Sequence, residues 1–407
     1  MKFQQVAAPA IRLARDGYPT SPVIAREISF MAESLRQDPG LAAMLFAPDG
    51  APHKAGDTLR SPELAATLAS LGDDPVASFY HGDIAQQIAA FVQQKGGILT
   101  ADDLAQYQPV WREPLHRHFE GYDVYVMPPP SSGGVVLEML AMLEPGNLGG
   151  LGVDSAPYLA RLIEVMRQGF VDRDAYGDPA FVKVPTALLL SDNHIFAARA
   201  RALSHSAPSP TPAPARDHGT TDLLVADAAG NVVALTTTIN TPFGAKLTVP
   251  KLGILLNDEM DDFAVAPGVP NAFHLAGASA NEIAPGKRPL SSMTPTIVLK
   301  NGKPVLATGG SGGPTIISGV LQVTLNLLVS HMPPAEAVAE PRVHEQAEPA
   351  TVAIEDGVPK QVEDELTKMG YALRPVPQLG AVGAILLAPG NLRGDFDHRK
   401  GGGAEGY

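Results

Sequence analysis

A change of residue pattern near the middle of this 407-residue chain limits most strongly what it can fold into. Residues 204–219 read SHSAPSPTPAPARDHG, which is rich in Pro, Ala and Ser and has no apolar period. Proline removes a backbone donor and fixes φ, so neither a helix nor a central strand can continue through this stretch. Helical patterns dominate before it and strand patterns after it. The sequence therefore predicts an α+β protein with a flexible, extended connector at residues 204–219.

The individual elements follow from apolar periodicity on each side of this connector. Helical spacing predicts helices near the N-terminus and over residues 84–97, 135–143, 156–171 and 315–330. Strand patterns predict a strand at residues 121–127 and two hairpins, at residues 220–240 and 294–309, the second turning at Asn301 and Gly302. No repeat of fixed period is present.

Composition excludes several classes of protein. The formal net charge of −13 disfavours nucleic acid or an anionic membrane as a partner, because both attract basic surfaces. No apolar run reaches the roughly 18 residues that a membrane helix needs, and the N-terminus lacks the apolar core of a signal peptide. The absence of cysteine excludes disulfides, thiolate metal sites and a cysteine nucleophile.

The stretch ARDHGTTDLLV raises the question of whether Thr220 starts a strand or attacks a carbonyl. Threonine favours strands, so a structural role is sufficient on propensity alone. However, the residue before Thr220 is Gly219, so no side chain lies on the residue whose carbonyl the Thr220 hydroxyl would attack. Cleavage after Gly219 would make Thr220 an N-terminus. An α-amino group has a reference pKa of about 7.7 and could serve as the base for the hydroxyl of the same residue. The sequence therefore offers Thr220 as a candidate nucleophile.

The hairpin register gives this hypothesis a geometric test. A turn at residues 227–231 sets Thr220 opposite Thr238, within about one residue. Because strand side chains alternate, Thr236, Thr238 and Asn240 share one face. A hydroxyl and an amide would then lie near Thr220, although a solvated row of threonines remains the alternative.

Three further stretches carry candidate chemistry. Residues 255–263 (LLNDEMDDF) are either a solvated acidic loop or a site in which Glu259 and Asp262 hold a substrate ammonium. Residues 287–295 (KRPLSSMTP) fix Ser291 and Ser292 between prolines. Residues 307–317 (ATGGSGGPTII) follow a predicted strand and open a helix, where successive glycine N–H groups can form an anion nest or oxyanion hole.

Together these motifs resemble the gamma-glutamyltranspeptidases of the N-terminal-nucleophile hydrolase superfamily. The similar stretches run in order along nearly the whole chain: PAIRLARDG, GYDVYVMPPPSSGG, YGDPAFVKVP, GTTDLLVADAAGNVVALTTTINTPFG, ILLNDEMDDFAVAPGVPN, KRPLSSMTPTIV and TGGSGG. The resemblance implies a four-layer αββα sandwich and a precursor that cleaves itself between Gly219 and Thr220. The resulting chains, residues 1–219 and 220–407, would form one intertwined αββα domain and stay associated.

The resemblance also implies a role for each candidate residue. Thr220 would be the nucleophile, acylated by a γ-glutamyl group from glutathione or glutamine. Water or an acceptor amino acid would then remove the γ-glutamyl group from Thr220. Thr238 would support it, Gly312 and Gly313 would form the oxyanion hole, and Phe273 would gate a lid at residues 267–275. The glutamyl ammonium would bind to Asn240, Glu259 and Asp262, and its carboxylate to Ser291 and Ser292. No cofactor and no metal are implied, and the location would be periplasmic or secreted.

The sequence departs from the family pattern in three places. Asp222 stands where many members have histidine, and Gly310-Ser311 stands where Ser-Pro is common. The chain also starts after the segment that in the family carries a signal peptide, core strands and a substrate-gripping arginine, so the expected sandwich is N-terminally truncated.

Two rival interpretations remain open from the residues. In the first, Ser311 lies in a G-x-S-x-G pattern between a strand and a helix, with His344 or His398 following in the order of a serine hydrolase. In the second, the chain is an inactive family member that binds without catalysis.

Overall fold

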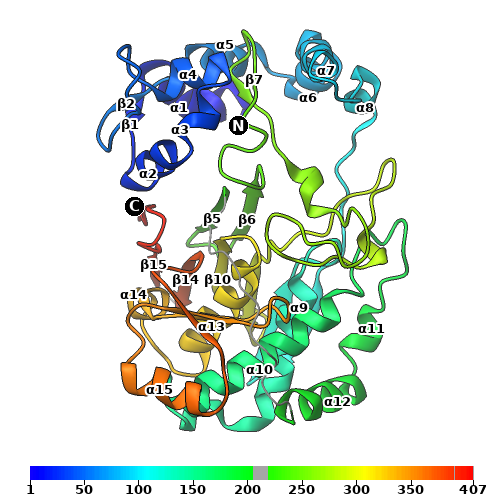
Figure 1. Ribbon diagram of the computed structural model, residues 1–407, viewed down its shortest axis with the longest axis vertical. Coiled ribbons are helices and arrows are strands. Elements are labelled where there is room, and N and C mark those ends of the chain that lie inside the picture. The colour runs from blue at the N-terminus through cyan, green and yellow to red at the C-terminus, as the bar shows by residue number, and fades with distance from the viewer. Residues whose placement is uncertain (205–218, 389, 407) are drawn as a thin grey trace. The chain divides into compact units, whose positions relative to one another are not determined.

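The computed structural model describes residues 1–204, 219–388 and 390–406, so most of the predicted connector, at residues 205–218, lies outside the described residues. The chain forms two compact units, labelled by element in Figure 1. The first comprises Met1–Trp111 and Pro242–Asp258, and the second comprises Arg112–Thr241 and Glu259–Tyr407. All the candidate site residues named above lie in the second unit.

The first unit is mainly helical, and its helices start with a recurring cap. Its elements are α1 (Phe3–Asp16), β1 (Tyr18–Pro19), α2 (Pro22–Phe30), α3 (Ala32–Leu35), α4 (Pro39–Leu45), β2 (Thr58–Leu59), α5 (Pro62–Ser70), α6 (Pro75–Tyr80), α7 (Asp83–Gln94), α8 (Ala101–Gln106), β7 (Thr248–Val249) and β8 (Ile254–Leu255). Four of these helices begin with proline after a Ser or Asp whose side chain accepts an N–H of the first turn: α2, α4, α5 and α6. Local sequence thus determines where these helices start.

The later segment of the first unit, residues 242–258, is tied to the helices by two buried hydrogen bonds. Thr67 Oγ1 donates to the Leu252 carbonyl at 2.8 Å, and the Thr248 amide donates to Asp38 at 3.1 Å. Asp38 therefore both caps α4 and holds β7.

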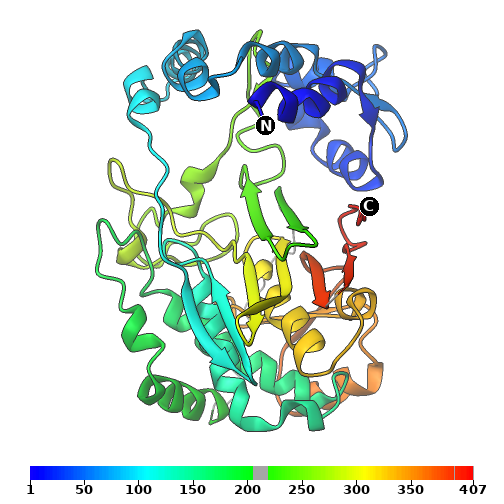
Figure 2. The same cartoon turned by 180° about the vertical axis from the view of Figure 1, so that it is seen from behind.

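A six-stranded antiparallel sheet organises the second unit. Its strand order is β15-β14-β10-β9-β4-β3. The strands are β3 (Leu115–Phe119), β4 (Tyr122–Val126), β9 (Thr296–Lys300), β10 (Lys303–Ser311), β14 (Ala381–Ala388) and β15 (Asn391–Asp395). Figure 2 shows the cyan strands β3 and β4 beside the yellow strands β9 and β10. Strands from before and after residue 219 therefore share one sheet.

Helices provide most of the core of this unit. They are α9 (Gly133–Leu143), α10 (Ala156–Arg173), α11 (Thr186–Leu189), α12 (Asp192–Leu203), α13 (Thr315–Leu328), α14 (Pro334–Ala339) and α15 (Lys360–Lys368), with short 3₁₀ turns at Glu144–Gly146, Leu148–Gly150, Glu259–Asp262 and Ser279–Asn281. Helices α9, α10 and α12 lie side by side (Figure 1), and α9 and α13 pack on the sheet. Helix α9 is apolar apart from Glu138, which accounts for its burial on all sides. Helix α13 is also buried along almost its whole length, including its polar residues Ser318, Gln322 and Asn326. A small sheet, β11 (Val343–His344), β12 (Val352–Glu355) and β13 (Leu373–Val376), completes the unit.

The hairpin β5 (Thr220–Ala226) and β6 (Val232–Thr238) packs on the opposite face of the six-stranded sheet from α13. In β14, Val382 lies against α13 at Gly319, whereas the next residue, Gly383, lies against Leu224 of the hairpin. Side chains on a strand alternate between faces, so helix and hairpin cover opposite sides. In the described residues, the six-stranded sheet therefore lies between a helical layer and the β5–β6 hairpin. In the part of the chain that the structure describes, no helix combines the length and apolarity needed to cross a membrane.

Candidate active site

Thr220 is the first residue of β5 and pairs directly with Thr238 of β6, as the hairpin register predicted. The Thr220 hydroxyl donates to Thr238 Oγ1 at 3.0 Å. The Asn240 amide donates to the same oxygen at 2.9 Å, and the Thr238 hydroxyl donates to the Gly219 carbonyl at 3.4 Å. One hydroxyl therefore links the candidate nucleophile to the carbonyl immediately before it.

Asp222 lies two residues further along the same face of β5. Its carboxylate accepts from the Thr236 hydroxyl at 2.9 Å and packs against Gly309 of β10, where an added Cβ would lie 2.2 Å from Asp222 Oδ1. Burial raises the pKa of Asp222 to about 6, and the Thr236 hydrogen bond opposes this shift. Glycine at position 309 is thus required for the hairpin to approach the sheet this closely.

The glycine-rich loop ends β10 and precedes α13, as the sequence predicted. Gly312 and Gly313 have φ of 143° and 59°, a backbone region that favours glycine. The Gly312 carbonyl accepts from Thr315 Oγ1 at 2.7 Å, and an added Cβ at Gly312 would lie 2.4 Å from the same atom. The loop is therefore held in a conformation that other residues cannot readily adopt.

Ser291 and Ser292 lie on an extended segment after the turn at residues 285–286, against residues 130–132. The Ser291 amide donates to the Pro130 carbonyl at 2.7 Å, and the Ser132 hydroxyl donates to the Ser291 carbonyl at 2.7 Å. The Ser291 hydroxyl oxygen accepts from the Met293 amide at 3.1 Å, and the Ser292 hydroxyl oxygen accepts from Arg173 at 3.2 Å. Within the described residues, neither hydroxyl donates its own proton. The hydroxyl protons of Ser291 and Ser292 are therefore available for hydrogen bonds to an acceptor such as a carboxylate.

Arg173, at the end of α10, is a residue that the sequence reasoning missed. Its guanidinium donates to Ser132 and Ser292 and is fully buried, and burial lowers its pKa to about 10, against the opposing effect of Asp262 and Asp174. Arg173 and Asp262 also line one small pocket. A cation and an anion on the walls of one pocket suit a ligand that carries both charges. The adjacent motif YGDPAFVKVP was visible in the sequence, but the role of Arg173 depends on its contact with Ser292, which lies 119 residues further along the chain.

Glu259, Asp262 and Phe273 lie on the segment between β8 and β9. Glu259 and Asp262 begin and end a 3₁₀ turn, and the Asp262 carbonyl accepts from Asn281 at 2.7 Å. Phe273 is buried, and its carbonyl accepts from Gln346 at 3.1 Å. The hydrogen bonds described here assemble Thr220, Thr238 and Asn240 as one group and Ser291, Ser292 and Arg173 as another.

The serine hydrolase arrangement is not formed. Ser311 is buried at the end of β10, and its hydroxyl donates to the Thr220 carbonyl at 2.5 Å. His344 bonds to Ser318 and Gln346 at 2.9 Å each, and His398 packs against Phe396. In the ranges that the structure describes, neither histidine hydrogen-bonds Ser311, so no base is provided for it in the way that pattern requires.

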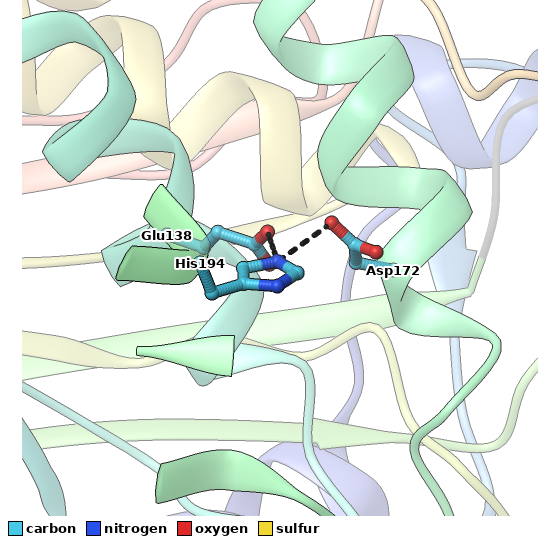
Figure 3. Close-up of side chains that lie close together, drawn as sticks. All are labelled: Glu138, Asp172 and His194. Atoms are coloured by element: carbon cyan, nitrogen blue, oxygen red, sulfur yellow. Dashed lines mark hydrogen bonds and ion pairs between the residues drawn. The ribbon is translucent and has the colours of Figure 1, made fainter. Parts of the chain in front are cut away.

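A separate cluster of possible metal ligands lies between three helices (Figure 3). Glu138 of α9, Asp172 of α10 and His194 of α12 converge, with His194 Nε2 lying 3.2 Å from Glu138 Oε1 and 3.1 Å from Asp172 Oδ2. Burial, followed by the neighbouring Asp172, raises the pKa of Glu138 to about 10. Asp172 also accepts from Gln168 at 2.7 Å and lies 3.9 Å from Arg201. Two carboxylates that meet one imidazole nitrogen in this way can share a proton among the three groups.

The layered fold, with a threonine at the start of a hairpin strand, is that of the N-terminal-nucleophile hydrolases. A family model described as gamma-glutamyltranspeptidase matches residues 1–407, and the chain belongs to this family of enzymes, as its motifs predicted. The chain is 38% identical to a glutathione hydrolase proenzyme of Escherichia coli strain K12 over 409 residues, covering 98% of this chain and 70% of that protein. The corresponding proenzyme of Bacillus subtilis strain 168 is 37% identical over 429 residues, covering 99% of this chain and 71% of that protein.

Comparison of structures gives the same fold. A cephalosporin acylase from Bacillus halodurans superposes with a TM-score of 0.84 at 28% identity, covering all of this chain and 75% of that one. The predicted fold class is thereby confirmed.

Proposed function

We propose that this chain cleaves itself between Gly219 and Thr220 and then transfers or hydrolyses γ-glutamyl groups through a γ-glutamyl-Thr220 acyl-enzyme. The observation that carries this proposal is the position of the Thr238 hydroxyl, which accepts from Thr220 and donates to the Gly219 carbonyl. Both acceptor positions of Thr238 Oγ1 are filled, by Thr220 and by the Asn240 amide, so its only proton points to the scissile carbonyl.

In this proposal, self-cleavage uses these contacts. Thr220 Oγ attacks the Gly219 carbonyl carbon and passes its proton to Thr238 Oγ1, and the Thr238 hydroxyl proton moves to the former carbonyl oxygen, which neutralises the developing oxyanion. The Gly219–Thr220 C–N bond breaks, the Thr220 nitrogen takes a proton, and Gly219 is left as an ester on Oγ. Water hydrolyses the ester to a Gly219 carboxylate, and the hydroxyl and amine of Thr220 become free.

The free amine then acts as the base for catalysis. It takes the hydroxyl proton as Oγ attacks the γ-carbonyl of a γ-glutamyl donor, and it returns the proton to the departing amine. Water or an acceptor amino acid releases the glutamyl group. The relatives named glutathione hydrolase support glutathione as a donor, and glutamine has the same γ-carbonyl chemistry.

The substrate contacts are assigned by chemistry. Ser291 and Ser292 would donate their hydroxyl protons to the α-carboxylate, with Arg173 fixing the Ser292 hydroxyl. Asn240, Glu259 and Asp262 would hold the α-ammonium. This assignment is supported by the two serine protons that no described acceptor uses.

The loop and lid have further roles in the proposal. Gly312 and Gly313 would present backbone N–H groups to the tetrahedral oxyanion, and Phe273 would gate the lid at residues 267–275. Residues 1–219 and 220–407 would remain associated after cleavage, because β4 pairs with β9 across the cut.

Intact-mass measurement on Thr220→Ala tests this proposal. The wild-type chain is expected to separate into residues 1–219 and 220–407 and to release glutamate from glutathione or glutamine, whereas Thr220→Ala stays whole and inactive. Thr237→Ala is the matched control, because Thr237 is the exposed neighbour of Thr238 and faces away from Thr220. A single chain that Ser311→Ala inactivates and Thr220→Ala does not would establish the serine mechanism instead.

A further inference from the structure

A hydrogen-bonded chain runs from the C-terminal segment to the candidate nucleophile. Lys400 Nζ donates to Ser311 Oγ at 2.7 Å, and the Ser311 hydroxyl donates to the Thr220 carbonyl at 2.5 Å. These residues are far apart in sequence, since Ser311 precedes Lys400 by 89 residues and follows Thr220 by 91. None of the roles assigned above involves Lys400.

The direction of this chain is fixed by its chemistry. A lysine ammonium can only donate, so Ser311 Oγ accepts from Lys400 and directs its single proton to the Thr220 carbonyl. A hydrogen bond from a charged donor polarises the hydroxyl and strengthens the next bond in the series. The positive charge of Lys400 thus strengthens the hydrogen bond from the Ser311 hydroxyl to the Thr220 carbonyl.

Lys400 is held in place by a buried ionic network next to it in sequence. Arg399 bonds to Glu355 at 2.6 Å and to Asp397 at 3.1 Å, and Asp397 bonds to Arg342 at 2.7 Å. The Val382 amide of β14 also donates to Asp397 at 2.9 Å. The segment that carries Lys400 is therefore fixed to the sheet by charged groups that are themselves almost fully buried.

Ser311 occupies a position from which it can align two parts of the site. It is the last residue of β10, immediately before Gly312 and Gly313, and its hydroxyl contacts the residue that would attack. The Thr220 hydroxyl is already held by Thr238. A second hold on the Thr220 carbonyl fixes the distance between the nucleophile and the glycine loop.

We infer that Lys400, acting through the Ser311 hydroxyl, is a positioning residue that aligns Thr220 with the Gly312-Gly313 loop for self-cleavage and for acyl transfer. This inference rests on the proposed function. Misplacing reacting groups by about 1 Å costs on the order of a hundredfold in rate, so loss of this alignment should cost roughly ten- to a hundredfold in kcat. KM for the donor should change little, because the residues proposed to bind it are elsewhere.

The test compares Lys400→Met, Ser311→Ala and the double variant in the full chain. Self-cleavage is followed by intact mass and turnover by glutamate release. If Lys400 acts through Ser311, the double variant is no slower than Ser311→Ala alone, and kcat falls without a matching rise in KM. Lys303→Met is the matched control, because Lys303 is exposed at the other end of β10. The inference would be overturned if the rate loss in the double variant equalled the product of the losses in the two single variants. An unaltered rate in Lys400→Met would overturn it as well.

A second measurement does not require catalysis. Hydrogen exchange over residues 219–226 should quicken in Lys400→Met and in Ser311→Ala, should be no faster in the double variant than in Ser311→Ala, and should stay unchanged in Lys303→Met. Unchanged exchange in Lys400→Met refutes the positioning role, even in a chain that does not cleave. Thr220→Ala measured in parallel keeps the outcomes distinct, because cleavage or activity in that variant contradicts the proposed function itself.

Discussion

The Glu138 cluster in Figure 3 gives a prediction about stability whose sign follows from linkage. The pKa of Glu138 is raised from 4.5 to about 10, so the folded protein keeps this carboxyl protonated over a pH range in which the unfolded chain ionises it. The contribution of Glu138 to the free energy of unfolding is therefore fully present below the pKa of this carboxyl in the unfolded chain. It is lost progressively as pH rises towards the folded value. Glu138→Gln retains a neutral polar group and removes this pH dependence.

The magnitude follows from the free energy of one pKa unit. Between the two pKa values, each pH unit lowers the free energy of unfolding by about 1.4 kcal/mol. From pH 6 to pH 8 the wild type should therefore lose about 2.7 kcal/mol that Glu138→Gln does not lose. Glu138 is fully buried, so little solvent screening reduces this effect.

Urea unfolding at pH 6, 7 and 8 measures the difference between wild type and Glu138→Gln. The gap in unfolding midpoint should widen steadily in favour of the variant as pH rises. Glu113→Gln, at an exposed position in the same unit, serves as the control and should show no widening. Parallel wild-type and Glu138→Gln curves across this range would refute the claim that Glu138 is protonated in the folded protein.

Three further predictions concern the hairpin and the site. Gly309→Ala should destabilise the protein by about 1–3 kcal/mol, because the new methyl group meets Asp222, and adding Asp222→Ala should recover part of this loss in urea unfolding. Ser292→Ala should raise KM for a γ-glutamyl donor roughly tenfold or more through loss of a charged hydrogen bond, with unaltered self-cleavage in the intact-mass assay; slower cleavage would contradict a purely substrate-binding role. Thr238→Ala should slow self-cleavage roughly a hundredfold, as expected for loss of an oxyanion donor, and Thr238→Ser should restore most of the rate; equal rates in both variants would exclude its hydroxyl.

The pairing of Thr220 with Thr238 was predictable because it depends on short-range rules. The turn at residues 227–231 and the period of two along each strand fix the register, and the structure has the same pairing. The hairpin around Asn301 and Gly302 was predictable for the same reason, as was the glycine loop that opens α13.

The contacts between distant segments could not be predicted from these rules. Strands β14 and β15 join β10 from the C-terminal region, and nothing in their local pattern names that partner. Arg173 reaches Ser292 from the end of a helix, and Lys400 reaches Ser311 across 89 residues. Such pairs depend on the packing of whole elements. Similarly, Glu138, Asp172 and His194 become one cluster only when three helices assemble.

The two faces of the β5–β6 hairpin differ in a way that matters for handling the protein. Leu223, Val225, Val233 and Leu235 point away from the six-stranded sheet and are 52%, 49%, 52% and 48% exposed. A two-stranded ribbon with an apolar outer surface invites concentration-dependent association with other molecules. Because side chains alternate, Thr220 and Asp222 lie on the other face. A lysine at Val225 or Val233 can therefore improve solubility without replacing any residue that faces the nucleophile.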